Sequence, residues 1–176
     1  NLINIIENSR NNALRRVNEE LIQMYWKVGE YLSKESKNTA FGDDYINSIA
    51  KEIQSAFPGI KGFTRRGLYR MKQFYEMYCE DEFVSALLTQ ISWTNHLMIM
   101  SKAKTVEERH FYITLCVQES YSSRELERQI ESSYYERYML SKEKILPEPI
   151  KGLKENPFLD SYVIEFLDLP KNFKES

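Results

Sequence analysis

Hydrophobic residues recur every three or four positions along most of this chain. Between Asn11 and about Ser33 they form a heptad-like stripe, which consists of Leu14, Val17, Leu21, Met24, Val28 and Tyr31. Such a stripe is typical of an amphipathic helix, and heptad spacing also suits a helix that pairs with a second copy. Two interpretations stay open, a core helix of one domain and a homodimer contact formed by Leu14, Val17, Leu21, Met24 and Val28.

Two further helices are predicted on either side of a short turn. Asp43 can cap a helix over 44–57, whose apolar face consists of Ile46, Ile49, Ala50, Ile53 and Phe57. Pro58-Gly59 ends this helix. After the turn, Thr64 can cap a helix over 65–78.

Capping signals predict the remaining helices. An apolar segment at 83–91 precedes Ser92, which can cap a helix that runs to about Lys102. Two capping-box patterns begin helices at 106–119 and 123–138, namely Thr105 with Glu108 and Ser122 with Glu125. We therefore predict an all-α domain of about six or seven helices over 1–146.

The composition changes after Leu146. Residues 59–146 contain no proline, whereas the next 24 residues contain Pro147, Pro149, Pro157 and Pro170. We therefore predict that 147–176 is a linker that leads into a second domain.

Composition and charge narrow the function classes. The chain is 42% hydrophobic with only 6 glycines and 5 prolines, which favours a packed helical core over a turn-rich β fold. A net charge of -2 excludes a globally basic nucleic-acid coat but allows a local basic patch. No apolar run is long enough to span a membrane, and Cys79 and Cys116 are expected to be reduced, as in a cytoplasmic protein.

One segment concentrates positive charge. Residues 59–75 contain five lysines and arginines and no acid, so the rest of the chain sums to -7. At 100° per residue, one face of the 65–78 helix is apolar and the other is basic with an aromatic and an amide. Arginine and lysine contact phosphates, and arginine, glutamine and tyrosine can reach base edges or sugars. The predicted nucleic-acid contacts are Lys61, Thr64, Arg65, Arg66, Tyr69, Arg70, Lys72 and Gln73.

Residues 44–78 contain a helix, a short turn and a basic helix, which is the order of elements in a helix-turn-helix motif. The second helix would then be the recognition helix. The connection is longer than the tight turn usual in this motif. A solvated basic face on a core helix is the alternative interpretation.

No catalytic or metal site is predicted in this chain. Its acids are scattered, apart from the run Glu80-Asp81-Glu82, which is more typical of a solvated helix end. His96 and His110 have no nucleophile at a defined spacing, and they do not combine with the two distant cysteines into a zinc site. His96 is expected to be an interior histidine. No small-molecule substrate and no cofactor are predicted.

Several motifs resemble the N-terminal domain of the bacterial YhcG-like proteins. The segments that carry this resemblance are Tyr25-Trp26-Lys27-Val28-Gly29, Phe41-Gly42, 57–75, Trp93-Thr94-Asn95-His96, 108–112, 121–126 and Tyr135-Glu136-Arg137. Gly67 and Tyr121 depart from it, because the family usually has asparagine and tryptophan at these positions.

The resemblance also has an implication for the C-terminal segment. Residues 156–170 look like the beginning of the family's PD-(D/E)XK nuclease domain, and this chain ends before that domain's catalytic motif. The catalytic residues, and a divalent metal such as Mg²⁺, would then belong to a domain outside this chain. We expect the isolated chain to have no nuclease activity.

Two function classes remain. The resemblance and the basic helix favour a DNA-binding and positioning domain of a nuclease-like protein. The alternative is a protein–protein interaction module, in which the N-terminal heptads, segment 83–100 and the aromatic residues Tyr134, Tyr135 and Tyr138 hold a partner subunit.

Overall fold

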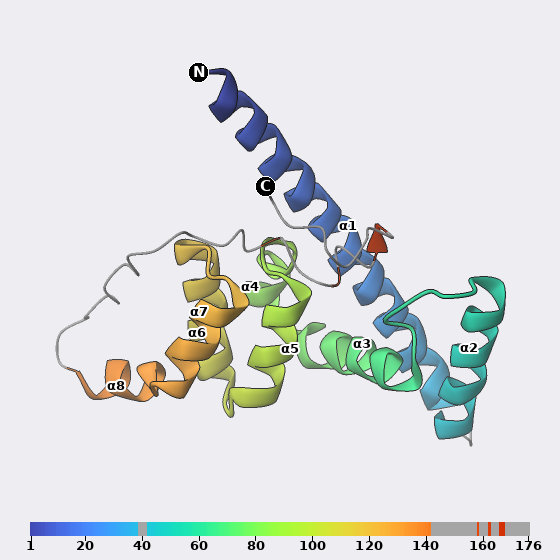
Figure 1. The fold of residues 1–176 in the computed structure, drawn as a ribbon. Helices are drawn as coiled ribbons and strands as arrows, with labels where there is room; N and C mark the ends of the chain where they lie inside the picture. The colour runs from blue at the N-terminus through green and yellow to red at the C-terminus, as the bar shows by residue number, and fades with distance from the viewer. Residues whose placement is uncertain (39–41, 142–157, 159–161, 163–165, 168–176) are drawn as a thin grey trace.

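The computed structural model describes residues 1–38, 42–141, 158, 162, 166 and 167. The described part of the chain is helical and contains no strand, so the all-α prediction is confirmed (Figure 1). Residues 142–157, and with them the predicted domain boundary near 146, lie outside the described residues, as does most of the predicted linker. The elements are α1 (Leu2–Asn38), α2 (Gly42–Ala56), α3 (Arg65–Tyr78), α4 (Glu82–Ser85), the 3₁₀ helix η1 (Leu88–Gln90), α5 (Trp93–Lys102), α6 (Val106–Glu119), α7 (Ser123–Glu131) and α8 (Tyr134–Leu140).

Helix α1 is longer than the predicted 11–33. It has 37 residues, and its N-terminal end extends beyond the other helices (Figure 1). The apolar residues of this extension are between 56% and 76% exposed, namely Leu2, Ile3, Ile5 and Ile6. The polar run 7–12 separates them from the heptad stripe in the sequence.

The heptad stripe of α1 packs mainly into the core. Leu21 is fully buried, and Leu14, Val17, Met24 and Val28 are half-buried against the core. Because Leu21 has no exposed surface, it cannot contact a second copy in this fold. The predicted dimer contact therefore rests on the four half-buried residues and stays a prediction.

Helices α1 and α3 lie close together. A Cβ atom on Gly29 of α1 would come within 2.1 Å of the Met71 carbonyl oxygen, so only glycine allows this approach. The rings of Tyr25 and Phe74 lie 4.7 and 5.1 Å from that of Trp93, which is also buried. This aromatic cluster joins α1, α3 and α5.

The predicted helix starts in the C-terminal half are confirmed. Ser92 and Thr105 accept hydrogen bonds from the third residue of α5 and α6, and Ser122 forms a reciprocal capping box with Glu125. At Thr105 the pattern is not reciprocal, because the Glu108 carboxylate accepts from the amide of Lys104 instead.

Several details of the predicted helices are wrong. Asp43 does not cap α2, because that helix begins at Gly42 and includes Asp43. The described residues form eight α-helices instead of six or seven. The predicted helix 123–138 is divided into α7 and α8, because Ser133 adopts a left-handed conformation with φ of 53°. Phe57, predicted on the apolar face of α2, follows the end of that helix and is 62% exposed.

His96 is an interior residue, as predicted. It is fully buried, and its Nε2 lies 2.8 Å from the carbonyl oxygen of Leu88. Burial lowers the pKa of His96 to about 4, so the ring is neutral at physiological pH. Asn18 of α1 donates to the carbonyls of Thr89 and Ile91, and these bonds hold the η1 segment against α1.

Candidate nucleic-acid interface

The turn between α2 and α3 is fixed by several contacts. The amide of Ile60 donates to the carbonyl of Phe57 at 3.1 Å, and Gly59 takes a φ of 85°, which favours glycine. The side-chain amide of Gln54 donates to the Ile60 carbonyl at 3.1 Å. Phe63 is buried, and its ring lies 6.3 Å from that of Tyr25 in α1. The turn is therefore attached to both α2 and α1.

The first turn of α3 lies directly against this connection. Thr64 caps the helix, and its Oγ1 accepts a hydrogen bond from the amide of Gly67 at 3.2 Å. A Cβ atom on Gly67 would lie only 1.8 Å from the Gly62 carbonyl oxygen. Glycine at 67 is thus required by the close approach of α3 to the turn.

The two faces of α3 have opposite character, as predicted. Leu68, Met71, Phe74 and Tyr78 are buried. Of the eight predicted nucleic-acid contacts, Lys61, Thr64, Arg65, Arg66 and Gln73 are exposed, whereas Tyr69, Arg70 and Lys72 are half-buried.

The guanidinium of Arg65 lies over the ring of Tyr69, 5.4 Å from its centroid. This contact orients Arg65, which is the first residue of α3. The first turn of α3 contains no acidic residue. The N-terminal end of α3 is therefore electropositive both from its side chains and from the helix dipole.

Lys72 differs from the other predicted contacts. Its Nζ lies 3.6 Å from Oε1 of Glu76, which also accepts a hydrogen bond from Ser33 at 2.9 Å. The basic segment predicted from the sequence ends at Tyr75 and so leaves out this acid. With Glu76, residues 59–76 have five basic residues and one acid, a net charge of +4.

Two hollows lie near α3, one beside it and one at its N-terminal end. A cavity of about 340 Å³ lies between α3 and α5 and is lined by Arg70, Gln73, Thr94, Leu97, Met98, Met100 and Ser101. An open groove of about 1080 Å³ lies between α2 and the turn and is lined by Ala50, Lys51, Gln54, Ser55, residues 59–64 and Tyr162.

Four of the eight predicted contacts line these two hollows. Lys61 and Thr64 line the groove beside α2, and Arg70 and Gln73 line the cavity beside α5. The residues that α2 and α5 contribute were not predicted. Lys51, Gln54 and Ser55 have the i, i+3, i+4 spacing of one polar helix face, and this signal could have identified them. The approach of α5 to α3 is tertiary and has no comparable signal.

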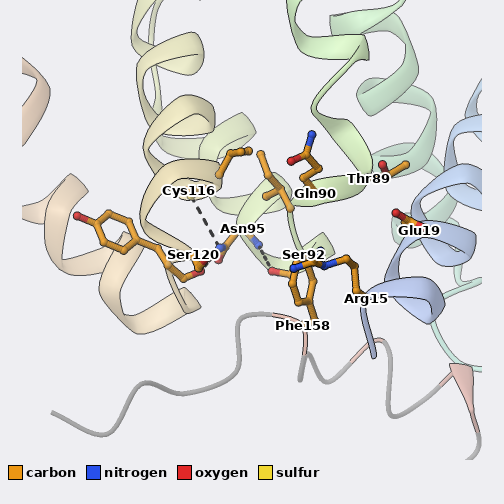
Figure 2. Close-up of a pocket in the computed structure, with 12 residues that line it drawn as sticks. Arg15, Glu19, Thr89, Gln90, Ser92, Asn95, Cys116, Ser120 and Phe158 are labelled. Carbon is orange, nitrogen blue, oxygen red and sulfur yellow. Dashed lines mark hydrogen bonds between the residues drawn. The ribbon is translucent and has the colours of Figure 1, made fainter. Parts of the chain in front are cut away.

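A third pocket, of about 310 Å³, lies at the N-terminal end of α5 (Figure 2). Its lining residues are Arg15, Glu19, Thr89, Gln90, Ile91, Ser92, Asn95, Cys116, Val117, Ser120, Tyr121 and Phe158. Asn95 is buried and donates to the Tyr121 carbonyl at 2.9 Å. Burial raises the pKa of the Cys116 thiol, which therefore stays protonated and is a poor nucleophile.

A histidine–acid pair joins α4 to α6. Nε2 of His110 lies 2.6 Å from Oδ2 of Asp81, which also caps α4 through the amide of Val84. Burial acts to raise the pKa of Asp81, but the hydrogen bonds from His110 and Val84 outweigh it and lower that pKa. In the described part of the chain, no group of three or more histidine, cysteine, aspartate or glutamate residues could hold a metal. None of the described helices is long and apolar enough to cross a membrane.

The chain belongs to the family described as the DUF1016 N-terminal domain, whose model matches residues 1–137. It is similar to the Escherichia coli (strain K12) protein described as "Putative nuclease YhcG", with 24% identity over 214 residues. This alignment covers 99% of the chain and 56% of the E. coli protein, so the chain spans about half the length of that relative. No solved structure matches. The resemblance found in the sequence is thereby confirmed.

Proposed function

We propose that this chain is a DNA-binding domain that positions a nuclease-like domain on its substrate. The observation that carries the proposal is the two-sided character of α3. One side is buried against α1, and the other presents Arg65 and Arg66 to solvent.

Packing accounts for only one side of this helix. Four residues on that side are buried. The opposite side carries several basic residues, although the chain as a whole has a net charge of -2. Arginine forms paired hydrogen bonds with phosphate oxygens and with guanine edges, and glutamine can pair with adenine. The outward residues of α3 therefore suit nucleic acid better than they suit an uncharged partner.

The two hollows near α3 support the same proposal. A helix that lies in the major groove, which is about 12 Å wide, has a phosphate strand on each side. Lys51 and Lys61 border the groove at the N-terminal end of α3, and Arg70 and Ser101 border the cavity between α3 and α5. These side chains would meet the two strands.

DNA is the proposed ligand because the relative is described as a nuclease and the chain covers its N-terminal part. In this proposal the helical domain binds DNA and a separate domain cleaves it. Helices α2 and α3 would then act as the helix-turn-helix-like unit predicted over 44–78.

The proposal is tested by titrating the protein with duplex DNA at several salt concentrations. If Lys61, Arg65, Arg66 and Arg70 each contact a phosphate, the slope of log affinity against log salt should be about -3 to -4. Replacing Arg66 and Arg70 with alanine should reduce the slope by about 2. The melting temperature should be measured as well, because Arg70 is half-buried.

The matched control is the double variant Arg124→Ala/Arg128→Ala. It removes the same charge at the same spacing from α7, where both arginines are exposed. This variant should keep the slope of the parent. If the two double variants bind DNA equally well, α3 is not the DNA-binding element and the proposal fails.

A second candidate function is protein–protein association, and a specific observation favours it. Leu2, Ile3, Ile5 and Ile6 are exposed on the end of α1 that extends beyond the other helices (Figure 1). Clustered exposed apolar residues are typical of an interaction surface. Sedimentation equilibrium tests this candidate. A dimer that becomes a monomer in the Ile5→Ser/Ile6→Ser variant would support self-association, and a parent that sediments at 21.0 kDa would reject it.

A further inference from the structure

Two aromatic residues beyond the helical domain lie against it. Phe158 and Tyr162 are both half-buried. The guanidinium of Arg15 in α1 lies over the ring of Phe158, 5.7 Å from its centroid. The ring of Tyr162 packs against the core, with its centroid 6.5 Å from that of Trp93 in an edge-to-face arrangement.

Each residue occupies a different hollow. Phe158 lines the pocket of about 310 Å³, where Figure 2 shows it beside Arg15 and Ser92. Tyr162 lines the open groove together with Lys61 and Thr64, two of the predicted nucleic-acid contacts. The pair therefore spans from the first half of α1 to the turn that precedes α3.

The contact is selective among the four described residues of this segment. Phe166 and Leu167, the other described residues of 142–176, are 45% and 42% exposed. An apolar segment that adhered at random would have no reason to bury the aromatic residues at 158 and 162 while leaving the one at 166 exposed. Cation–π and edge-to-face contacts are directional, and this accounts for the difference.

We propose that Phe158 and Tyr162 anchor the segment that follows the helical domain, and that Tyr162 supports the turn at 59–64. The surface that receives them consists of α1, the start of α5 and the groove beside α2. The partner that fits this surface is the chain's own C-terminal segment.

The consequence for DNA binding rests on the proposed function. Because Tyr162 lies in the groove with Lys61 and Thr64, the chain after residue 162 begins beside the proposed DNA contacts. A domain that follows in a longer protein would then start close to bound DNA, at a position set by the two anchors. The predicted linker would act as a docked connection.

The expected strength follows from the two contacts. A cation–π contact at a partly exposed site favours docking by about two- to fivefold, and an aromatic pair by about two- to tenfold. Removing both should raise the undocked population by about 5- to 50-fold, before any loss of apolar burial is counted.

Hydrogen–deuterium exchange of the 176-residue protein without DNA tests the anchoring directly. In the Phe158→Ala/Tyr162→Ala variant, amides of the 158–162 segment should exchange about 5- to 50-fold faster than in the parent. The matched control is Phe166→Ala, which removes an exposed ring from the same segment and should change nothing. The anchoring is overturned if the double variant exchanges like the parent, or if the parent segment already exchanges at the rate of an unfolded peptide.

The support of the turn has its own readout. Tyr162→Ala should accelerate exchange in peptides that cover 59–64, and Phe158→Ala should not, because only Tyr162 lines that groove. If Tyr162→Ala leaves these peptides unchanged, this part of the proposal is wrong. Both variants remove half-buried side chains, so an unchanged far-UV circular dichroism spectrum will show that the helices remain folded.

A double-mutant cycle assigns the first anchor to its partner. Arg15→Ala and Phe158→Ala should each accelerate exchange of the segment, and the double variant should be no faster than Phe158→Ala alone. Additive effects would overturn the pairing. Since no DNA is present, these measurements stand even if the salt titration finds no DNA binding, so the two proposals fail separately.

Discussion

Replacing Gly67 with alanine tests whether α3 lies as close to the preceding turn as the structure indicates. Gly67 is the third residue of α3, so helix propensity alone favours alanine there by about 0.8–1 kcal/mol. The structure predicts instead that Gly67→Ala lowers the stability of the fold. The added Cβ would lie 1.8 Å from the Gly62 carbonyl oxygen and 2.9 Å from the carbonyl carbon.

The size of the effect depends on which atoms must move. Both clashing atoms are backbone, so relief requires a shift of the turn and not a rotation of a side chain. Overpacking of this kind costs about 1–3 kcal/mol. For a domain of this size, 1 kcal/mol corresponds to about 2–4 °C, so the melting temperature should fall by about 2–12 °C. A displaced turn should also weaken DNA binding, because it carries Lys61 and Thr64.

Differential scanning calorimetry measures the change, with Gln23→Ala as the control. Gln23 is exposed in the middle of α1, so its replacement should have little effect on stability. If Gly67→Ala raises the melting temperature, helix propensity outweighs the contact, and the close approach between α3 and the turn is wrong.

Three other outcomes are expected. Leu68→Ala should destabilise the fold by about 2–5 kcal/mol in urea unfolding, because Leu68 is fully buried. Burial lowers the pKa of His96 from 6.5 to about 4. At a pH between these two values, His96 is protonated in the unfolded chain but not in the folded chain. Stability should therefore fall by about 2 kcal/mol from pH 7 to pH 5, and His96→Gln should lose this dependence. The isolated chain should not cleave plasmid DNA with Mg²⁺ or Mn²⁺, and cleavage that follows the protein through repurification would contradict this.

Local signals predicted most of the fold. Ser92, Thr105 and Ser122 begin helices where predicted, because a hydroxyl that accepts from an amide three residues later acts within a single turn. The division of 123–138 was missed because Ser133 takes its left-handed conformation without glycine. The extension of α1 was missed because the polar run 7–12 separates its apolar residues from the heptad stripe.

The candidate site was predicted only as far as it is local. The 3.6-residue period separates Arg66 from Leu68, and the structure places them on opposite sides of α3 as predicted. This period describes only one helix at a time. It therefore could not predict that Thr94 and Ser101 of α5 share a hollow with Gln73 of α3. One local feature was missed as well, because Glu76, which pairs with Lys72 one turn away on the same helix, follows directly after the predicted basic segment 59–75.

Helix α3 takes part in both stability and proposed binding, and its geometry allows the two to be separated. Leu68 and Met71 face the core, whereas Arg66 and Gln73 face solvent, so substitutions of these pairs should affect one property each. Arg70 lies between the faces and is half-buried. Because the same backbone holds both faces, any change that moves α3 relative to α1 must also move the basic face. The close contact between Gly29 and the Met71 carbonyl therefore bears on the position of the proposed DNA contacts, although Gly29 itself is buried.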